Sequence, residues 1–413
     1  MNPSGIRGGL AGLFAQGATL GASFTPLFWG RTEALVVLVV ATAAASSLIP
    51  LLSLAASHTL PTFRDARTVD RRVRVVMIWT AGWVALGAVA GTVVFVLPSG
   101  DRALGAVIFA AAVLAGGQTL FTVALAVLAR RGDFAIAMRV RLVYGVVALA
   151  LTLGATVTDA APALYVLAIA GGYYGALTIL VASRTRRAIQ LLRGDGERSA
   201  RLLFDALRGT WRLVLALTTG AVAGQVGALV TPALGAFAEA WAVVVRVTSG
   251  FQTVGLQIVG VATDIRVSRA VREVNAEAIS AEIRRGTKLG LLLASVSAVV
   301  ATGAAVVLDV GNQTGSWASF GLCAAVYSLS LTALAPIGRV LGFVGNHWQR
   351  LSWEVSRLAV SLCAVLLLSE DALMVSVALA SLAAYLAYVV LIGLNLRRPA
   401  SRRGEEGALD AQN

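Results

Sequence analysis

Long apolar stretches recur along the whole chain, and they constrain its fold more than any other feature. Of the 413 residues, 58% are hydrophobic and 13% are charged, whereas a soluble domain carries about 25% charged residues. A run of about 20 apolar residues is long enough to cross the hydrocarbon core of a membrane as a helix. These runs lack the alternation of apolar and polar residues that membrane β-strands need. The sequence therefore predicts an all-α integral membrane protein.

We expect about twelve transmembrane helices, and no secretory signal pattern precedes the first of them. The predicted spans are 9–29, 33–57, 75–97, 103–129, 139–158, 161–182, 212–234, 237–262, 288–309, 316–337, 352–369 and 372–395.

The distribution of charge predicts how these spans are oriented. Arginines are concentrated in 58–74, 130–131, 183–211 and 264–285, and after residue 396. The other loops are short and mostly acidic, and Arg31 and Arg102 are their basic residues. Loops rich in Lys and Arg stay in the cytoplasm, so both termini are expected there, in a multi-pass protein of the cytoplasmic membrane. Orientation thus explains the net charge of +13 without a nucleic-acid partner.

The longest cytoplasmic connection divides the predicted spans into two groups of six. We expect an N-terminal lobe at 1–182, a cytoplasmic linker at 183–211, a C-terminal lobe at 212–396 and a disordered cytoplasmic tail at 397–413.

The two halves share an internal repeat, which an offset of 206 residues reveals. Residues 21–40 and 227–246 have the same residue at Gly21/Gly227, Ala22/Ala228, Thr25/Thr231, Pro26/Pro232, Glu33/Glu239, Ala34/Ala240, Val37/Val243 and Val39/Val245. Because each half has an even number of spans, both halves enter the membrane in the same direction. The lobes are then expected to be related by a pseudo-twofold axis along the membrane normal, with a central cavity between them.

Arg246 is the leading candidate for a functional residue, because it lies deep inside the predicted span 237–262. A charge at the bilayer centre costs at least about 2.5–3.5 kcal/mol and normally faces a cavity or a partner. Two explanations remain open. The guanidinium could contact an anionic substrate such as a lipid diphosphate, or it could form an ion pair with Glu239 or Glu33 that locks spans together.

Polar residues in the repeated helices form a second group of candidates. Gln16, Gln225 and Gln252 lie in predicted spans, and Arg31 lies at an external loop. They could line a shared substrate cavity, although hydrogen bonds between helices would also explain the glutamines.

Glu354 and Arg357 are the remaining charged candidates. They are three residues apart near the cytoplasmic end of the span 352–369, a spacing that favours a local ion pair.

Nothing in the sequence indicates an enzyme. We find no catalytic constellation and no nucleotide-binding motif, and we expect no cofactor. Cys323 and Cys363 are isolated, and His58 and His347 lie near membrane boundaries, so no metal site is predicted.

Three features resemble the polysaccharide flippase branch of the multidrug/oligosaccharidyl-lipid/polysaccharide exporter superfamily. One is the arrangement of twelve spans in two lobes. The second is PALGAFAEAWAVVVRVTSGF at 232–251, followed by the charged stretch REVNAEAISAEIRRG at 272–286. The third is PIGRVLGFVGNHWQRLSWEVSRLAVSLC at 336–363.

The resemblance implies that the protein flips a polyprenyl-diphosphate-linked oligosaccharide across the membrane by alternating access, for cell-surface polysaccharide biosynthesis. Its expected partners are that lipid-linked oligosaccharide, membrane lipids and other membrane proteins of polysaccharide assembly. The alternatives are a small-molecule or drug exporter of the same superfamily and an integral-membrane polysaccharide polymerase or glycosyltransferase. Such enzymes usually need a larger external loop or an acidic catalytic motif.

Reporter fusions test the predicted topology. Fusions at 58–74, 183–211 and 264–285 should report a cytoplasmic location, and fusions at 98–102 and 310–315 an external one, because basic loops are retained inside. A cytoplasmic signal at 310–315 would contradict the twelve-span topology.

Overall fold

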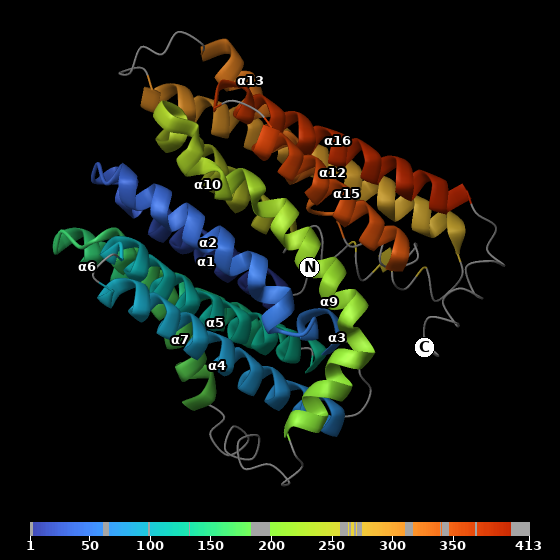
Figure 1. The fold of residues 1–413 in the computed structure, drawn as a ribbon. Helices are drawn as coiled ribbons and strands as arrows, with labels where there is room; N and C mark the ends of the chain where they lie inside the picture. Colours follow the sequence, from blue (N-terminus) through green and yellow to red (C-terminus); the bar gives the residue numbers. More distant parts are fainter. Residues whose placement is uncertain are drawn as a thin grey trace. The chain divides into compact units, whose positions relative to one another are not determined.

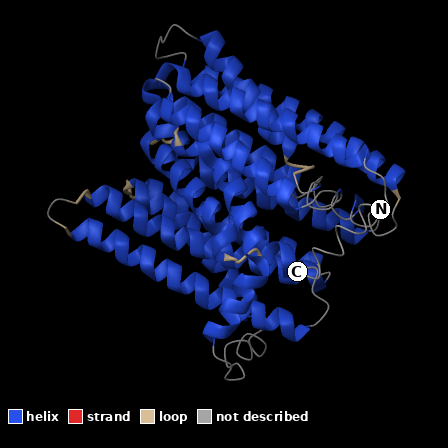
Figure 2. Cartoon of the chain, turned by 45° about the vertical axis from the view of Figure 1, so that its right-hand side comes forward, coloured by secondary structure: helices blue, strands red, loops and turns tan. Residues whose placement is uncertain are grey.

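The computed structural model describes residues 3–60, 66–97, 100–131, 133–182, 199–256, 275–309, 317–338, 347–367 and 370–397, together with 263, 266–267, 270 and 340. Within these residues every regular element is a helix, and Figure 2 shows no strand.

Twelve helices of 17 residues or more lie in the described part of the chain, and each coincides with one predicted span. They are α1 (Pro3–Phe28), α2 (Thr32–Leu52), α4 (Ala66–Val96), α5 (Arg102–Arg131), α6 (Phe134–Val157), α7 (Pro162–Ala182), α9 (Ser199–Leu229), α10 (Ala238–Val254), α12 (Ala276–Asp309), α13 (Trp317–Leu334), α15 (His347–Leu367) and α16 (Glu370–Arg397). Two short elements accompany them, α3 (Ala56–Thr59) and the 3-10 helix η2 (Thr231–Phe237).

Eight of these helices are long and apolar enough to cross a membrane by length and composition, namely α2, α4, α5, α6, α7, α9, α12 and α16. For two of the other long helices, the sequence explains why they do not meet this criterion of length and apolar composition. The described part of α10 has 17 residues, and α15 contains Arg350, Glu354 and Arg357. The all-α membrane fold that the sequence predicts is confirmed.

The helix α9 begins within the predicted cytoplasmic linker. Residues 199–211 form its first turns, and the stretch Thr210–Gly235, which is long and apolar enough to cross a membrane, agrees with the predicted span 212–234. Phe204, Leu207 and Trp211 recur in the first turns at spacings of three and four residues, the period of a helix with one apolar face. The rest of the predicted linker, 183–198, and residues 398–413 of the predicted tail lie outside the described residues.

Backbone packing divides the chain into two compact units, Met1–Gln225 and Val226–Asn413. By this division most of α9 groups with the first unit. The predicted lobes, 1–182 and 212–396, and the pseudo-twofold relation between them stay predictions.

In the first unit α5 is the central helix (Figure 1). It packs against α2, α4 and α7, while α6 packs against α1 and α7. The core between these helices is built largely from small side chains, and Ala110, Ala148, Ala170 and Ala176 are almost completely buried there. Small residues let helix backbones approach closely, which is the main source of packing where no water has to be expelled.

In the second unit α13 packs against α12 and α16, while α10 packs against α12 and α13, and α15 against α16. Its core contains larger side chains than that of the first unit, including Ile337, Trp353 and Tyr388. Tyr388 donates a hydrogen bond of 2.8 Å to the carbonyl oxygen of Ile337, and the indole nitrogen of Trp353 donates one of 3.3 Å to the carbonyl oxygen of Ala384. These bonds fix α16 to the chain that follows α13, and α15 to α16.

Two glycines mark a close approach of the backbones of α4 and α5. A methyl group on Gly91 would lie 2.6 Å from the backbone nitrogen of Phe109, and one on Gly105 would lie 2.5 Å from that of Phe95. Since backbone atoms cannot move aside as a flexible side chain can, these two positions require glycine.

We therefore expect Gly91→Ala to lower the stability of the protein by about 1–3 kcal/mol, the usual cost of overpacking. Gly82→Ala in the same helix is the matched control, because its methyl group would meet nothing within 4 Å. Thermal unfolding in detergent measures both variants. Equal melting temperatures for the two would contradict the close α4–α5 contact.

Candidate functional site

The repeated Thr-Pro sequences make the same local contact in both halves of the chain. Thr25 Oγ1 donates a hydrogen bond of 2.8 Å to the carbonyl oxygen of Gly21, and Thr231 Oγ1 donates one of 3.4 Å to that of Gly227. Proline lacks a backbone N–H and disturbs the helix around it, and α1 ends at Phe28, two residues after its proline. Because many serines and threonines of this chain make the same local bond, the internal repeat stays a prediction.

The junction between α9 and α10 is irregular. The 3-10 helix Thr231–Phe237 fills it, and Gly235 inside this segment has a φ of 50°. A left-handed backbone favours glycine, which has no side chain to clash. The break lets α10 begin anew at Ala238, with Glu239 exposed in its first turn.

An aromatic cluster packs α10 against α13. Trp241 is completely buried and donates a hydrogen bond of 2.8 Å to the carbonyl oxygen of Gly227. Its ring lies 5.0 Å from that of Tyr327 and 6.3 Å from that of Phe320, measured between centroids. Gly227 is required here, because a methyl group at this position would lie 2.6 Å from the Tyr327 hydroxyl oxygen.

A chain of buried hydroxyl groups joins α10, α12 and α13 further along. Thr248 donates to Ser328 at 2.9 Å, Ser328 and Ser297 share a bond of 2.7 Å, and Thr332 donates to Ser297 at 3.2 Å. All four side chains are 0–1% exposed. Such interhelical hydrogen bonds fix neighbouring helices in a medium without water, so the position of α10 is fixed at both ends of its buried part.

Arg246 lies between these two attachments. It is 9% exposed and stands eight residues after the first residue of α10, which is about 12 Å along the helix axis. Glu239 precedes it by two helical turns, on the same side of α10. The equivalent residue in the first half is Val40, so the charge has no counterpart there. Its role as a substrate contact or as an ion-pair partner of Glu239 or Glu33 stays a prediction.

Glu354 and Arg357 form a buried ion pair, with 3.8 Å between Oε2 and Nη1 and 8% and 9% of the side chains exposed. The guanidinium also lies 5.5 Å from the centre of the Trp353 ring, and it interacts electrostatically with Tyr327. Because α15 begins at His347 and ends at Leu367, Arg357 lies at the centre of this helix; its depth in the membrane stays a prediction.

The other predicted site residues are dispersed. Arg31 forms an ion pair with Asp159, which lies between α6 and α7, and both side chains are substantially exposed. Glu33 is exposed in the first turn of α2. Gln16 on α1, Gln225 on α9 and Gln252 on α10 are half-buried.

Sequence reasoning missed Trp241, Tyr327 and the buried hydroxyl chain. The signal for the hydroxyl chain is the sequence YSLSLT at 327–332, which places Ser328 and Thr332 one helical turn apart in an apolar helix. Nothing in the sequence links Tyr327 to Trp241, because the contact joins residues on two helices.

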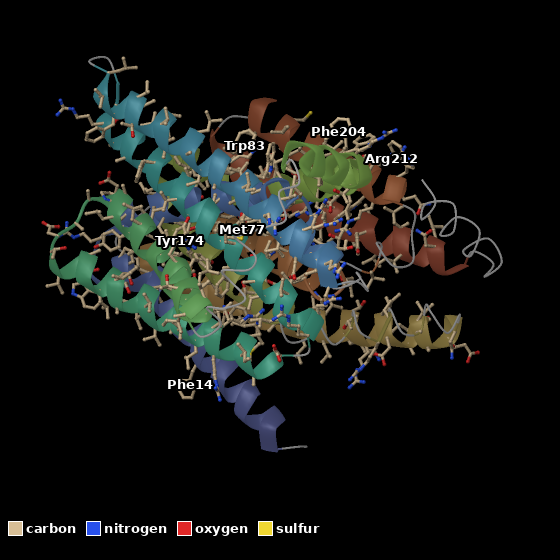
Figure 3. The ribbon with its side chains drawn as sticks, turned by 90° about the horizontal axis from the view of Figure 1, so that it is seen from below. Phe14, Met77, Trp83, Tyr174, Phe204 and Arg212 are labelled. Atoms are coloured by element: carbon tan, nitrogen blue, oxygen red, sulfur yellow. The ribbon has the colours of Figure 1, made fainter. Side chains whose placement is uncertain are left out.

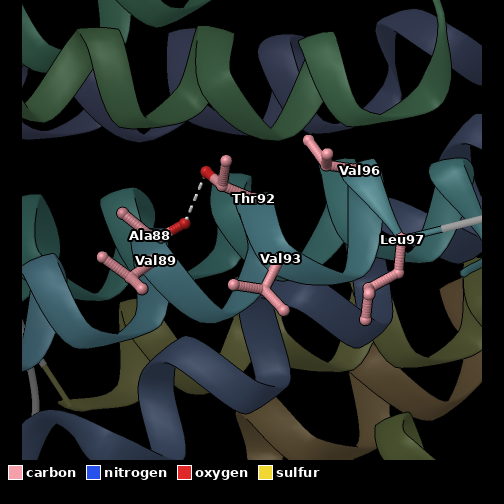
Figure 4. Close-up of a pocket in the computed structure, with 6 residues that line it drawn as sticks. All are labelled: Ala88, Val89, Thr92, Val93, Val96 and Leu97. Carbon is pink, nitrogen blue, oxygen red and sulfur yellow. Dashed lines mark hydrogen bonds between the residues drawn. The ribbon is translucent and has the colours of Figure 1, made fainter.

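A shallow hollow on the surface of α4 is lined by Ala88, Val89, Thr92, Val93, Val96 and Leu97 (Figure 4). Its one hydroxyl, that of Thr92, donates 2.8 Å to the carbonyl oxygen of Ala88. The surface is apolar and exposed on a membrane-spanning helix, so contact with lipid explains it.

The buried ion pair predicts a large difference between two glutamate substitutions. Glu354→Ala leaves the Arg357 charge buried without its carboxylate and should lower stability by about 3 kcal/mol. Glu282→Ala removes a partly exposed ion pair with Arg266 and should cost less than about 1 kcal/mol. Thermal unfolding of both variants, and of Glu354→Ala combined with Arg357→Met, measures the difference. Recovery of stability in the double variant is expected, and its absence would contradict the assigned pairing.

Comparisons with known proteins find similarity in structure. No protein-family model and no curated protein matches the chain significantly. A crystal structure of a MATE transporter in complex with MaD3S is 14% identical and covers 94% of this chain and 95% of its own, with a TM-score of 0.58.

Two further structures belong to multidrug resistance MATE family transporters of the MOP superfamily. The outward-facing conformation is 13% identical, with a TM-score of 0.54 and coverage of 94% of this chain and 95% of its own. The inward-facing conformation is 14% identical, with a TM-score of 0.53 and coverage of 94% of both chains. The chain therefore has the fold of the MATE transporters over nearly its whole length.

Proposed function

We propose that this protein is an exporter in a cell membrane, that it works by alternating access, and that it carries small organic molecules. The observation that carries the proposal is the likeness of nearly the whole chain to multidrug resistance MATE transporters. Solved structures of that fold include an inward-facing and an outward-facing conformation. A transporter needs two such states, because its site must open to each side of the membrane in turn.

The comparisons favour the small-molecule exporter over the flippase that the sequence resemblance implied. The similar structures carry multidrug names, and none of those cited is described as a flippase. Flipping of a polyprenyl-diphosphate-linked oligosaccharide is the second candidate, and buried Arg246 favours it because a guanidinium binds phosphate oxygens well.

The buried charges also bear on the chemistry of the cargo. Among the described residues the buried charged side chains are Arg72, Arg246 and Glu354. Glu354 is paired with Arg357. We propose that the cargo is anionic or neutral, because the guanidinium of Arg246 is buried in α10 and would bind an anionic group better than a cationic one.

Efflux from intact cells tests the role of Arg246. Cells producing the protein should export an anionic fluorescent dye, and Arg246→Ala should slow that export at least about tenfold, because a buried charged contact is worth 1.4 kcal/mol or more. Arg246→Lys should lose less, since it keeps the charge but not the bidentate geometry. Lys288→Ala, an exposed charge on α12, is the matched control and should export normally.

Three other outcomes would count against parts of the proposal. Normal export by Arg246→Ala at unchanged protein level would remove Arg246 from the transport path. Export of a cationic dye instead of the anionic one would contradict the proposed cargo. Restoration of surface polysaccharide in a flippase-deficient strain, without dye export, would favour the second candidate.

A further inference from the structure

The chain after α2 turns through an unusual backbone conformation. Leu54 and Ala55 have φ angles of 50° and 56°, in the left-handed region that residues other than glycine avoid. Ser53, Leu54 and Ala55 are completely buried. Such a turn persists only where its surroundings hold it in place.

Side chains of α4 hold this turn. The indole nitrogen of Trp79 donates to the carbonyl oxygen of Leu51 at 3.1 Å, and Thr80 Oγ1 donates to that of Leu52 at 3.1 Å. Arg72 Nη2 donates to that of Leu54 at 2.8 Å. Three side chains of one helix thus bind carbonyl groups at the end of α2 and in the turn that follows it.

The same nitrogen of Arg72 also reaches α9. Arg72 Nη2 donates a hydrogen bond of 2.9 Å to the hydroxyl oxygen of Thr210. Beside this bond, Ala55 of the turn packs with Val214 and Leu217 of α9. One buried guanidinium therefore connects α4, the strained turn and α9. Figure 3 labels Met77 and Trp83 on α4, and Phe204 and Arg212 on α9.

The attachment of α9 is weak in other respects. Among the described elements, α9 makes only sparse backbone contacts with each of the other helices, whereas α4 and α5 pack along their whole length. The helix also passes from the first compact unit into the second, since the division falls after Gln225 and α9 ends at Leu229. A loosely packed helix that joins two units must follow any movement between them.

We propose that Arg72 is the fixed half of a releasable latch, and that its bond to Thr210 holds α9 against the turn at Leu54 and Ala55 in one state of the protein. Release breaks the Arg72–Thr210 bond and the Ala55–Val214–Leu217 contact, while the bond from Arg72 to Leu54 keeps the turn in place. The latch is a conformational device of the first unit. Its link to transport rests on the proposed export function.

Spin labels test release without any transported molecule. Labels are placed at Ala66→Cys and Arg208→Cys, two exposed positions on α4 and α9, in protein with Cys323→Ser and Cys363→Ser. Pulsed electron resonance in nanodiscs should give two distances between the labels, a short one for the latched state and a longer one for the released state.

Thr210→Val should shift the ratio of these two populations toward the longer distance by about tenfold or more, which is the effect of losing one hydrogen bond to a charged donor. Thr210→Ser, which keeps the hydroxyl, should resemble the unchanged protein. A single distance that Thr210→Val does not alter would overturn the latch.

A reversible disulfide tests whether release is needed for transport. Ala55→Cys with Val214→Cys should form a bond on oxidation that stops dye export, and a reductant should restore export. The control is Val147→Cys with Gly175→Cys, on α6 and α7 of the same unit. A Cβ atom on Gly175 lies 3.9 Å from that of Val147, close to disulfide geometry, and this crosslink should leave export unchanged.

Full export with the Ala55–Val214 disulfide formed would overturn the latch, because α9 would then not need to leave the turn. If the protein without crosslinks exports no dye, the proposed function fails. The spin-label distances then show by themselves whether α9 is released from the turn.

Discussion

A polar group inside a membrane-spanning helix must find its partner within the protein, because the hydrocarbon offers none. In this chain most hydroxyl groups find it locally. Thr19, Ser47 and Thr122 each donate to the carbonyl oxygen four residues earlier, over 2.7–2.8 Å. This local bond lets serine and threonine occupy apolar helices without a partner on another helix, and it accounts for much of the polarity of the spans.

Polar groups that reach beyond their own helix determine the packing. Trp241, the hydroxyl chain from Thr248 to Thr332, and Tyr388 connect different segments of the second unit. In the first unit the corresponding contacts come from Trp79, Thr80 and Arg72. Each of these bonds would be expensive to break in the absence of water. The helices are therefore fixed by a few specific contacts as well as by the small residues between them.

Charge is arranged differently in the two units. The buried charge of the first unit, Arg72, contacts a backbone carbonyl and a hydroxyl rather than a carboxylate. The second unit pairs Glu354 with Arg357 at the centre of α15 and keeps Arg246 buried in α10. Breaking one bond from a guanidinium to a neutral hydroxyl costs less than separating a buried ion pair, which suits a movable contact. A buried ion pair is costly to separate and suits a fixed one.

The sequence by itself determined where the helices are and that they span a membrane. Hydropathy and periodicity are properties of neighbouring residues, so each predicted span coincides with a described helix. Only the tertiary structure decided that Arg31 meets Asp159, that Arg72 reaches Thr210 across 138 residues of sequence, and that most of α9 belongs with the first unit. The left-handed turn at Leu54 and Ala55 likewise could not be predicted from the sequence, because neither residue is a glycine. Local pattern cannot determine these features, because they depend on which helices pack together, and the free energy of that packing comes from residues far apart in the chain.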